Sequence, residues 1–276
     1  MGGLDLMLWD NFLEQDNIDK KPGAVFTHIN NEYNFFPLWL KHYNKYYAPE
    51  DIYVLAHNSN KDFEDYLLEG VKNKKFNLMP LTLLSWFNSS WMCQNVSIFQ
   101  WLLLQSYKTV MYADVDEFVF TDPESKWKDL KDYYLNFEDD TSVVKGYHIL
   151  TDPYRDAPID INLPITEQRN RYLYDPFLDK PLIATKHALY NYGQHTTRNI
   201  SGPMTDDLIM FHLHYIDIDW VLEKDNKREK KDWSKEDLAC GFSSQNLPAN
   251  KQVKMGNFFA NYMMGRPIPE KYIGIL

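Results

Sequence analysis

Apolar runs alternate with segments of helical periodicity through the first half of the chain. Strands are predicted by β-prone apolar runs at 24–29, 51–57 and 109–120. Helices are predicted by aromatic and aliphatic residues that recur at helical spacing over 32–47, 62–72 and 90–106. Because such alternation favours right-handed crossovers, the sequence predicts an α/β fold with a mostly parallel central sheet flanked by helices.

The second half has a looser pattern. Further strands are predicted at 142–150, 180–184 and 207–215. Residues 152–181 are rich in Pro, Asp, Arg and aromatics without clear periodicity, which is typical of functional loops, and we expect acceptor contacts there. Residues 224–235 form a charge-dense run that predicts a solvated helix or loop with no catalytic role.

Three acids, Asp114, Asp116 and Glu117, lie in the apolar run 109–120. Burying carboxylates is costly unless cations or hydrogen-bond donors compensate them, so this placement indicates a function. In an extended segment Asp114 and Asp116 share one face, and two oxygen ligands suit Mg²⁺ or Mn²⁺. The alternative is a strand that simply ends in an acidic turn. In parallel sheets ligands bind outside the carboxyl ends of the strands, where these acids are expected.

Histidines supply further candidate ligands. His212 and His214 are two apart in a predicted strand, so both rings face one side and can complete a metal site with the carboxylates. A half-buried aromatic role is the alternative for either residue alone. His195 follows Gly193-Gln194, where glycine permits a tight turn, and is expected to line the same cleft on the acceptor side, unless it is only a polar loop residue.

Composition narrows the class of protein. The 276 residues are 44% hydrophobic with a formal net charge of −10, which fits a single domain over 1–276 and argues against nucleic-acid binding. The two cysteines have no metal-ligand spacing and favour a reducing compartment. The first ten residues lack the features of a secretion signal, and the apolar stretches are too short for a membrane span. We therefore expect a cytoplasmic protein.

Several motifs together resemble one enzyme family. They are Asn31-Glu32, Pro37-Leu38-Trp39-Leu40, His42-Tyr43, Asp114-Val115-Asp116-Glu117-Phe118, Gly193-Gln194-His195 and His212-Leu213-His214-Tyr215. In their order and spacing they resemble the family-2-like glycosyltransferases of the GT-A fold, with an Asp-x-Asp motif. The resemblance covers about 24–220 and leaves 221–276 as a C-terminal extension.

This resemblance implies transfer of a sugar from a nucleotide-sugar donor, with a UDP-sugar favoured over a GDP-sugar, to a glycan, lipid-linked or small-molecule acceptor. It implies Asp116 as the principal ligand of Mn²⁺ or Mg²⁺, a late histidine as a second ligand, and Asp114 facing the ribose or a metal-bound water. Donor contacts are expected at Thr27, Asn31, Glu32, His57, Asn58, Asp62, Asp114, Val115 and Lys180. One departure is His57, which stands where the family commonly has an acid that receives the base.

The acceptor side requires other groups. Glu117 is expected to contact the acceptor with His195. If the reaction inverts the anomeric centre, an acid must accept the proton of the acceptor hydroxyl, and the candidates are Asp206, Asp207 and then Asp152. A turn or helix cap is the alternative role for Asp206 and Asp207.

Two rival hypotheses remain. A Mg²⁺-dependent phosphatase or phosphotransferase also uses Asp-x-Asp after an apolar strand, with the first Asp as nucleophile. A non-catalytic carbohydrate-binding relative would use the abundant Trp and Tyr to stack on sugars. Hydrolysis of a nucleotide sugar would support the transferase, and hydrolysis of a phosphomonoester would support the phosphatase. Ligand binding without turnover of any donor would support the non-catalytic relative.

Overall fold

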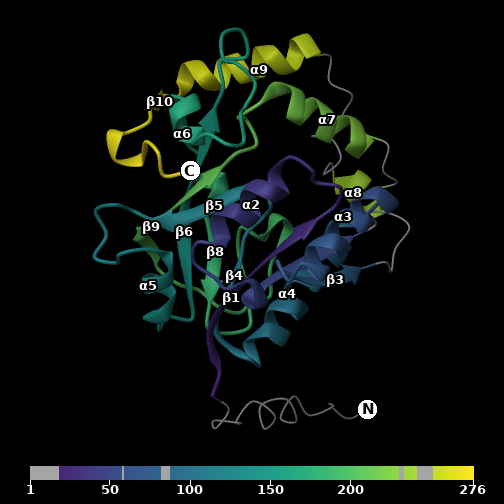
Figure 1. The fold of residues 1–276 in the computed structure, drawn as a ribbon, viewed down its shortest axis with the longest axis vertical. Helices are drawn as coiled ribbons and strands as arrows, with labels where there is room; N and C mark the ends of the chain where they lie inside the picture. Colours follow the sequence, from purple (N-terminus) through teal and green to yellow (C-terminus); the bar gives the residue numbers. More distant parts are fainter. Residues whose placement is uncertain (1–18, 58, 82–87, 230–232, 241–250) are drawn as a thin grey trace.

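The computed structural model describes residues 19–57, 59–81, 88–229, 233–240 and 251–276, and Figure 1 shows their arrangement. The strands are β1 (Lys21–Ile29), β2 (Ile52–His57), β3 (Asn77–Leu81), β4 (Tyr107–Tyr112), β5 (Glu117–Thr121), β6 (Thr141–Leu150), β7 (Arg171–Tyr174), β8 (Lys180–Ala184), β9 (Met204–His212) and β10 (Arg266–Pro267). The helices are α2 (Phe35–Tyr43), α3 (Lys61–Lys72), α4 (Ser89–Leu104), α5 (Leu130–Leu135), α6 (Ile165–Gln168), α7 (Ile218–Glu229), α8 (Lys235–Cys240) and α9 (Lys251–Met264).

The described strands form one mixed sheet in the order β10-β7-β6-β8-β4-β1-β2-β3, with β9 beside β6 and β5 beside β9. Strands β3, β2, β1 and β4 are parallel neighbours, as the alternation of strands and helices predicts. Beyond β4 the pairs are antiparallel except for β6 with β9. The predicted α/β class, with helices flanking a central sheet, is confirmed.

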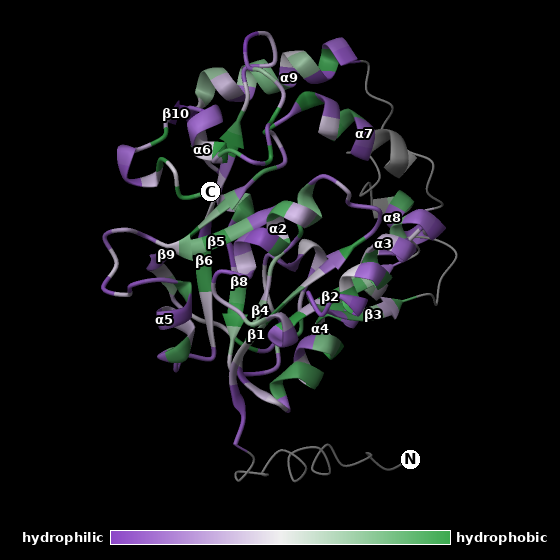
Figure 2. Ribbon diagram, viewed as in Figure 1, coloured by the Kyte–Doolittle hydropathy of each residue, from purple (hydrophilic) through white to green (hydrophobic). Residues whose placement is uncertain are grey.

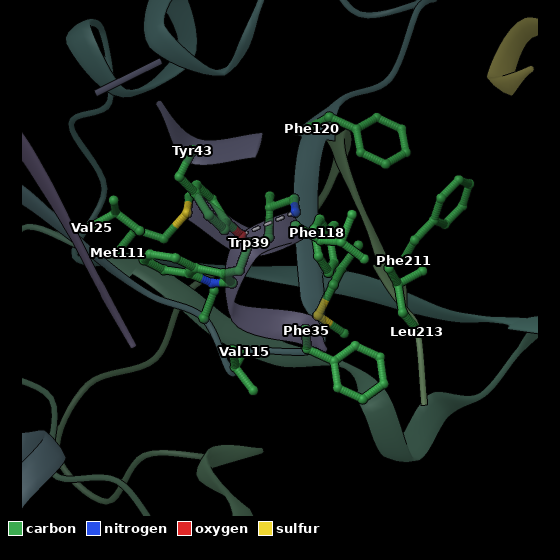
Figure 3. Close-up of a cluster of buried hydrophobic side chains, with 14 of the residues drawn as sticks. Val25, Phe35, Trp39, Tyr43, Met111, Val115, Phe118, Phe120, Phe211 and Leu213 are labelled. Atoms are coloured by element: carbon green, nitrogen blue, oxygen red, sulfur yellow. Dashed lines mark hydrogen bonds between the residues drawn. The ribbon is translucent and has the colours of Figure 1, made fainter. Parts of the chain in front are cut away.

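The central strands are buried on both faces. Val25 and Met111 pack towards α2, whose Trp39 and Tyr43 lie beside them in the larger core, as Figure 3 shows. Their strand neighbours Ala24, Phe26, Val110 and Tyr112 face α4 on the other side. This two-sided burial accounts for the continuous apolar runs in the sequence, and Figure 2 shows hydrophobic segments, in green, within the central sheet.

Two predicted segments have more structure than expected. Residues 152–181 contain α6 and β7, and β7 pairs with both β6 and β10. The C-terminal extension rejoins the sheet through β10, and the backbone carbonyl of Leu276 accepts a hydrogen bond of 2.6 Å from the backbone of Ile165. Helix α9 contacts α7, and the two lie side by side at one end of the molecule in Figure 1.

Candidate functional site

The Asp-x-Asp segment forms a turn between two strands. β4 ends at Tyr112 and β5 begins at Glu117, and the backbone N–H of Glu117 donates to the carbonyl of Asp114 at 2.9 Å. The predicted single strand 109–120 is therefore interrupted at the acids. In an extended strand Asp114 and Asp116 would lie on one face and could bind the same cation. Because the segment turns instead, each carboxylate pairs with a different lysine.

Asp114 belongs to a buried charge cluster with Lys180 and Glu117. The Lys180 ammonium lies 2.7 Å from Asp114 Oδ2 and 2.5 Å from Glu117 Oε1. The register that pairs Met111 with Ile183, continued along both strands, brings Lys180 opposite Asp114. The Tyr112 hydroxyl donates to Asp114 Oδ1. This cluster fixes the first Asp of the motif and neutralises it.

Burial and Lys180 act in opposite directions on these carboxyls. Burial by itself raises the pKa of Asp114, but the Lys180 ammonium outweighs it and holds the pKa below its ordinary value. Burial raises the pKa of Glu117, against the opposing effect of Lys180. The pKa of Lys180 is raised, because its two carboxylate partners outweigh its own burial. Lys180 is thus a permanent cation at the base of the turn.

Asp116 lies in a second cluster. Its Oδ2 is 2.9 Å from the Lys224 ammonium, 3.6 Å from His212 Nε2 and 3.9 Å from His214 Nδ1. The carboxylate of Glu32 lies 3.7 Å from the same ammonium. Burial raises the pKa of Asp116, yet Lys224 and the two imidazoles together hold it well below its ordinary range. Asp116 is therefore a carboxylate at neutral pH.

Strand pairing brings the histidines to Asp116. β5 and β9 run antiparallel with Glu117 opposite His212, and the backbone N–H of Leu213 donates to the carbonyl of Asp116 at 2.8 Å. The rings of His212 and His214 stack at 5.7 Å with an interplanar angle of 5°. Both rings therefore lie on one side, as their spacing predicts.

A third histidine continues the chain of polar contacts. His148 on β6 neighbours His212 in the parallel β6–β9 pair. Its Nδ1 lies 3.1 Å from His212 Nδ1, and its Nε2 lies 3.3 Å from Asp175 Oδ2. Burial and the neighbouring His212 lower the pKa of His148 to about 4, so His148 is neutral at pH 7. Its Nε2–H then donates to Asp175, and its Nδ1 accepts from His212.

This network bears on metal binding. Nε2 of His212 faces the carboxylate oxygen of Asp116 at 3.6 Å, so the imidazole and the carboxylate point into the same space. One carboxylate and two imidazoles are suitable donors for Mn²⁺ or Mg²⁺, with the imidazoles favouring Mn²⁺. Within the described ranges, however, no three His, Cys, Asp or Glu side chains are placed to hold a metal ion together. The carboxylate and the imidazoles are thus chemically suited to the ion. In this structure, however, the Asp116 carboxylate is paired with the Lys224 ammonium.

The residues predicted for the donor nucleotide gather at the ends of β1 and β2. Asn31 has φ 56° and its side-chain oxygen accepts from the backbone of Asn60 at 2.9 Å, which joins the two strand ends. Glu32 reaches the Asp116 cluster through Lys224. His57 is buried at the end of β2, and its carbonyl accepts from the side chain of Asn30. Asp62 is exposed in the first turn of α3, and Asn58 lies outside the described residues.

Several predicted residues lie away from this cluster or are already engaged. Thr27 is fully buried within β1, and Val115 packs into the core beside Met111 (Figure 3). Glu117 is 1% exposed, and its carboxylate pairs with Lys180 and accepts from the backbone of Asp114.

Asp206 and Asp207 begin β9, at the opposite end from His212. There they pair with Lys145 and with Ser125 Oγ respectively. A base must lie within hydrogen-bond reach of the reacting hydroxyl, and the length of the strand separates these two acids from Asp116.

Asp152 and His195 remain near the cluster. Asp152 follows the end of β6, where Thr151 bonds to the backbone of Tyr215 at 3.0 Å, so it lies at the same edge as His214. Burial, followed by the charge of Lys180, lowers the pKa of His195 to about 4. Gly193 has φ 71°, which the predicted tight turn requires.

Sequence reasoning missed Lys224, His148 and Asp175. Lys224 falls in the run 224–235 that predicts a solvated segment, yet it is 8% exposed. The spacing from Val221 could have predicted this burial. Lys224 follows Val221 by three positions, so it shares the buried face of a helix that begins earlier, at Ile218. His148 is an ordinary strand residue in the sequence, and only the β6–β9 pairing reveals its contact.

No protein-family model matches this chain, and no curated protein matches it by sequence. Residues 1–349 of TarS from S. aureus superpose with a TM-score of 0.39 at 11% identity, covering 88% of this chain and 72% of TarS. The same TarS fragment in complex with UDP gives a TM-score of 0.40 at the same identity and coverage. A putative glucose-1-phosphate thymidylyltransferase from Bacillus anthracis, in complex with a sucrose, gives 0.30 at 11% identity, covering 60% of this chain and 69% of that one. These likenesses are too remote to assign a family.

None of the helices in the described part of the chain has the length and apolar character needed to cross a membrane.

Proposed function

We propose that this chain is a glycosyltransferase that uses a nucleotide-sugar donor, with a UDP-sugar as the first candidate. The supporting observation is Asp116, a buried carboxylate at the carboxyl end of parallel strands that faces two imidazoles. Ligands of open α/β sheets bind at this edge. The residues at the ends of β1 and β2 lie at the same edge, which suits a nucleotide beside the Asp-x-Asp turn.

The charges suit departure of a nucleoside diphosphate. Breaking the bond between sugar and phosphate places negative charge on the leaving group, and fixed cations stabilise that charge without reorganising. Mn²⁺ or Mg²⁺ bound at Asp116 with His212 or His214 supplies such a charge. Lys180 fixes the Asp114 carboxylate in the turn, where we assign it a contact with the ribose or with a metal-bound water.

Asp152 is the proposed base if the reaction inverts the anomeric centre. Of the three candidate acids, Asp152 alone lies at the edge that carries His214. Its Oδ1 accepts from the backbone of Tyr154 at 3.0 Å, which orients the carboxylate. His195 is the proposed acceptor contact, because its half-buried ring lies close enough to Lys180, Asp114 and His212 for their charges to act on it. The acceptor is a glycan, a lipid-linked sugar or a small molecule.

The hydrogen bonds of Asp114 do not favour the phosphatase alternative. In that chemistry the first Asp of the motif attacks phosphorus, so its carboxylate must be free to act as a nucleophile. Here Tyr112 binds one carboxylate oxygen and Lys180 binds the other.

A thermal-shift screen tests the proposal. UDP, GDP, CDP and TDP are each added with and without Mn²⁺ to the wild type, to Asp116→Asn and to Asp219→Asn, which removes an exposed carboxylate on α7 as the control. Because a ligand that binds only the folded state stabilises it, we expect one nucleotide with Mn²⁺ to raise the Tm of the wild type and the control but not of Asp116→Asn. No response to any nucleotide would refute the proposal.

A further inference from the structure

Lys224 is held in place by the packing of its own helix. The side chain of Asp217 caps the start of α7, accepting from the backbone of Trp220 at 3.2 Å. The Trp220 ring packs edge-on against Phe35 of α2 at 5.3 Å, and the Lys224 ammonium lies 5.2 Å from the same Phe35 ring. Helix α7 thus presents the ammonium to Asp116 from a fixed position.

The ammonium and a divalent ion need the same atom. Asp116 Oδ2 is the oxygen bound by Lys224 and also the oxygen nearest both imidazoles. A metal bonded to Oδ2 at about 2.1 Å would lie against a like charge, in a buried site where repulsion is weakly screened. The two cations therefore repel each other at this oxygen, and each weakens the binding of the other.

We propose that Lys224 is a built-in cation that competes with a divalent metal ion for Asp116, so that α7 sets the metal affinity of the site. This inference rests on the metal site of the proposed function. Without metal, Lys224 pairs with Asp116 and lies near Glu32. When metal binds, Lys224 must withdraw, and the contacts that α7 makes through it are lost.

Binding of Mn²⁺ alone, without nucleotide, tests the competition. Free Mn²⁺ is measured by electron paramagnetic resonance in titrations of the wild type, Lys224→Met and Lys251→Met. Lys251 of α9 is the control because it pairs at 2.8 Å with Asp219 of α7, but its side chain is 57% exposed. We expect Lys224→Met to bind Mn²⁺ at least tenfold more tightly than the wild type, and Lys251→Met to bind as the wild type does. Equal or weaker binding by Lys224→Met, or no binding by any of the three, would overturn the proposal.

A second measurement needs no substitution. Hydrogen exchange of the wild type with and without Mn²⁺ should show faster exchange for α7 amides, with α3 unchanged as the internal reference. Slower or unchanged exchange in α7 while Mn²⁺ binds would contradict competition. If both measurements give the expected results but no nucleotide raises the Tm, the competition between Lys224 and the metal stands and the proposed transferase function fails. The two proposals can therefore be tested separately.

Discussion

The Nδ1 atoms of His212 and His148 lie 3.1 Å apart, on neighbouring parallel strands. Since His148 uses its other nitrogen towards Asp175, this contact fixes the ring of His212 and turns its Nε2 towards Asp116. A partner that fixes the tautomer of a histidine is typical of metal ligands. His214 makes the longer approach to Asp116, at 3.9 Å, so His212 is the better candidate ligand of the two.

Replacing His148 should therefore weaken metal binding. We expect His148→Ala to lower the affinity for Mn²⁺ by about 10–100-fold, because His212 loses the acceptor that fixes its ring. The measurement is a Mn²⁺ titration followed by calorimetry. His187→Ala, which changes a histidine on the α4 side of the sheet, should bind Mn²⁺ as the wild type does. Unchanged affinity in His148→Ala would exclude this positioning role.

Removing Lys180 should destabilise the fold. Lys180→Met leaves the carboxylates of Asp114 and Glu117 buried without their cation, and breaking a buried ion pair from one side costs about 3–5 kcal/mol. Urea unfolding measures the loss. The double variant Lys180→Met with Glu117→Gln should recover part of it, because one unpaired charge is gone. A loss below about 1 kcal/mol, the range of an exposed pair, would contradict the assigned burial.

Stability should fall as the pH drops below neutrality. Burial lowers the pKa of His42 to about 3 and that of His148 to about 4, both below the ordinary 6.5. Between these values and 6.5 the unfolded chain binds protons that the folded chain does not, so folding weakens as pH falls through this window. These two buried groups give a slope of about 2–3 kcal/mol per pH unit near pH 5, and the half-buried His195, whose pKa is lowered to about 4, adds to it.

Urea unfolding at several pH values from 4.5 to 6 measures this slope. His42→Phe should reduce it by about 1 kcal/mol per pH unit, although the variant also loses the 2.8 Å bond between His42 Nε2 and the carbonyl of Val119. A stability that is flat across this range would show that the histidines are not buried as neutral rings.

The turn before His195 requires glycine. Gly193 has φ 71°, and a Cβ there would meet His195 Cδ2 at 2.6 Å. We expect Gly193→Ala to cost about 1–3 kcal/mol in the free energy of unfolding and to displace His195. Gly256→Ala in α9 is the control, because a Cβ there meets nothing within 4 Å and should stabilise the helix by about 0.5–1 kcal/mol. Equal effects of the two substitutions would refute the strain argument.

Local pattern was enough to predict the elements that position the site. The apolar runs that form β1, β2 and β4 in the structure are buried on both faces. Strands of this kind are recognisable in the sequence because consecutive residues are apolar. The spacing of His212 and His214 likewise predicts that their rings share a side, because strand geometry is local. The predicted strand at Lys180–Ala184 is β8, with the same bounds.

The partners of these residues depended on which strands and helices pack together. Asp114 and Asp116 are two apart, yet β8 brings Lys180 to the first and α7 brings Lys224 to the second. Asp206 and Asp207 precede the histidines in sequence, but the length of β9 separates them from Asp116. The sequence alone determined the alternation of strands and helices, because hydrophobic periodicity is a short-range property, but it did not determine the turn at the acids. The tertiary structure decided which cation neutralises each carboxylate, because contacts between residues as distant as Asp116 and Lys224 arise only when separate elements pack.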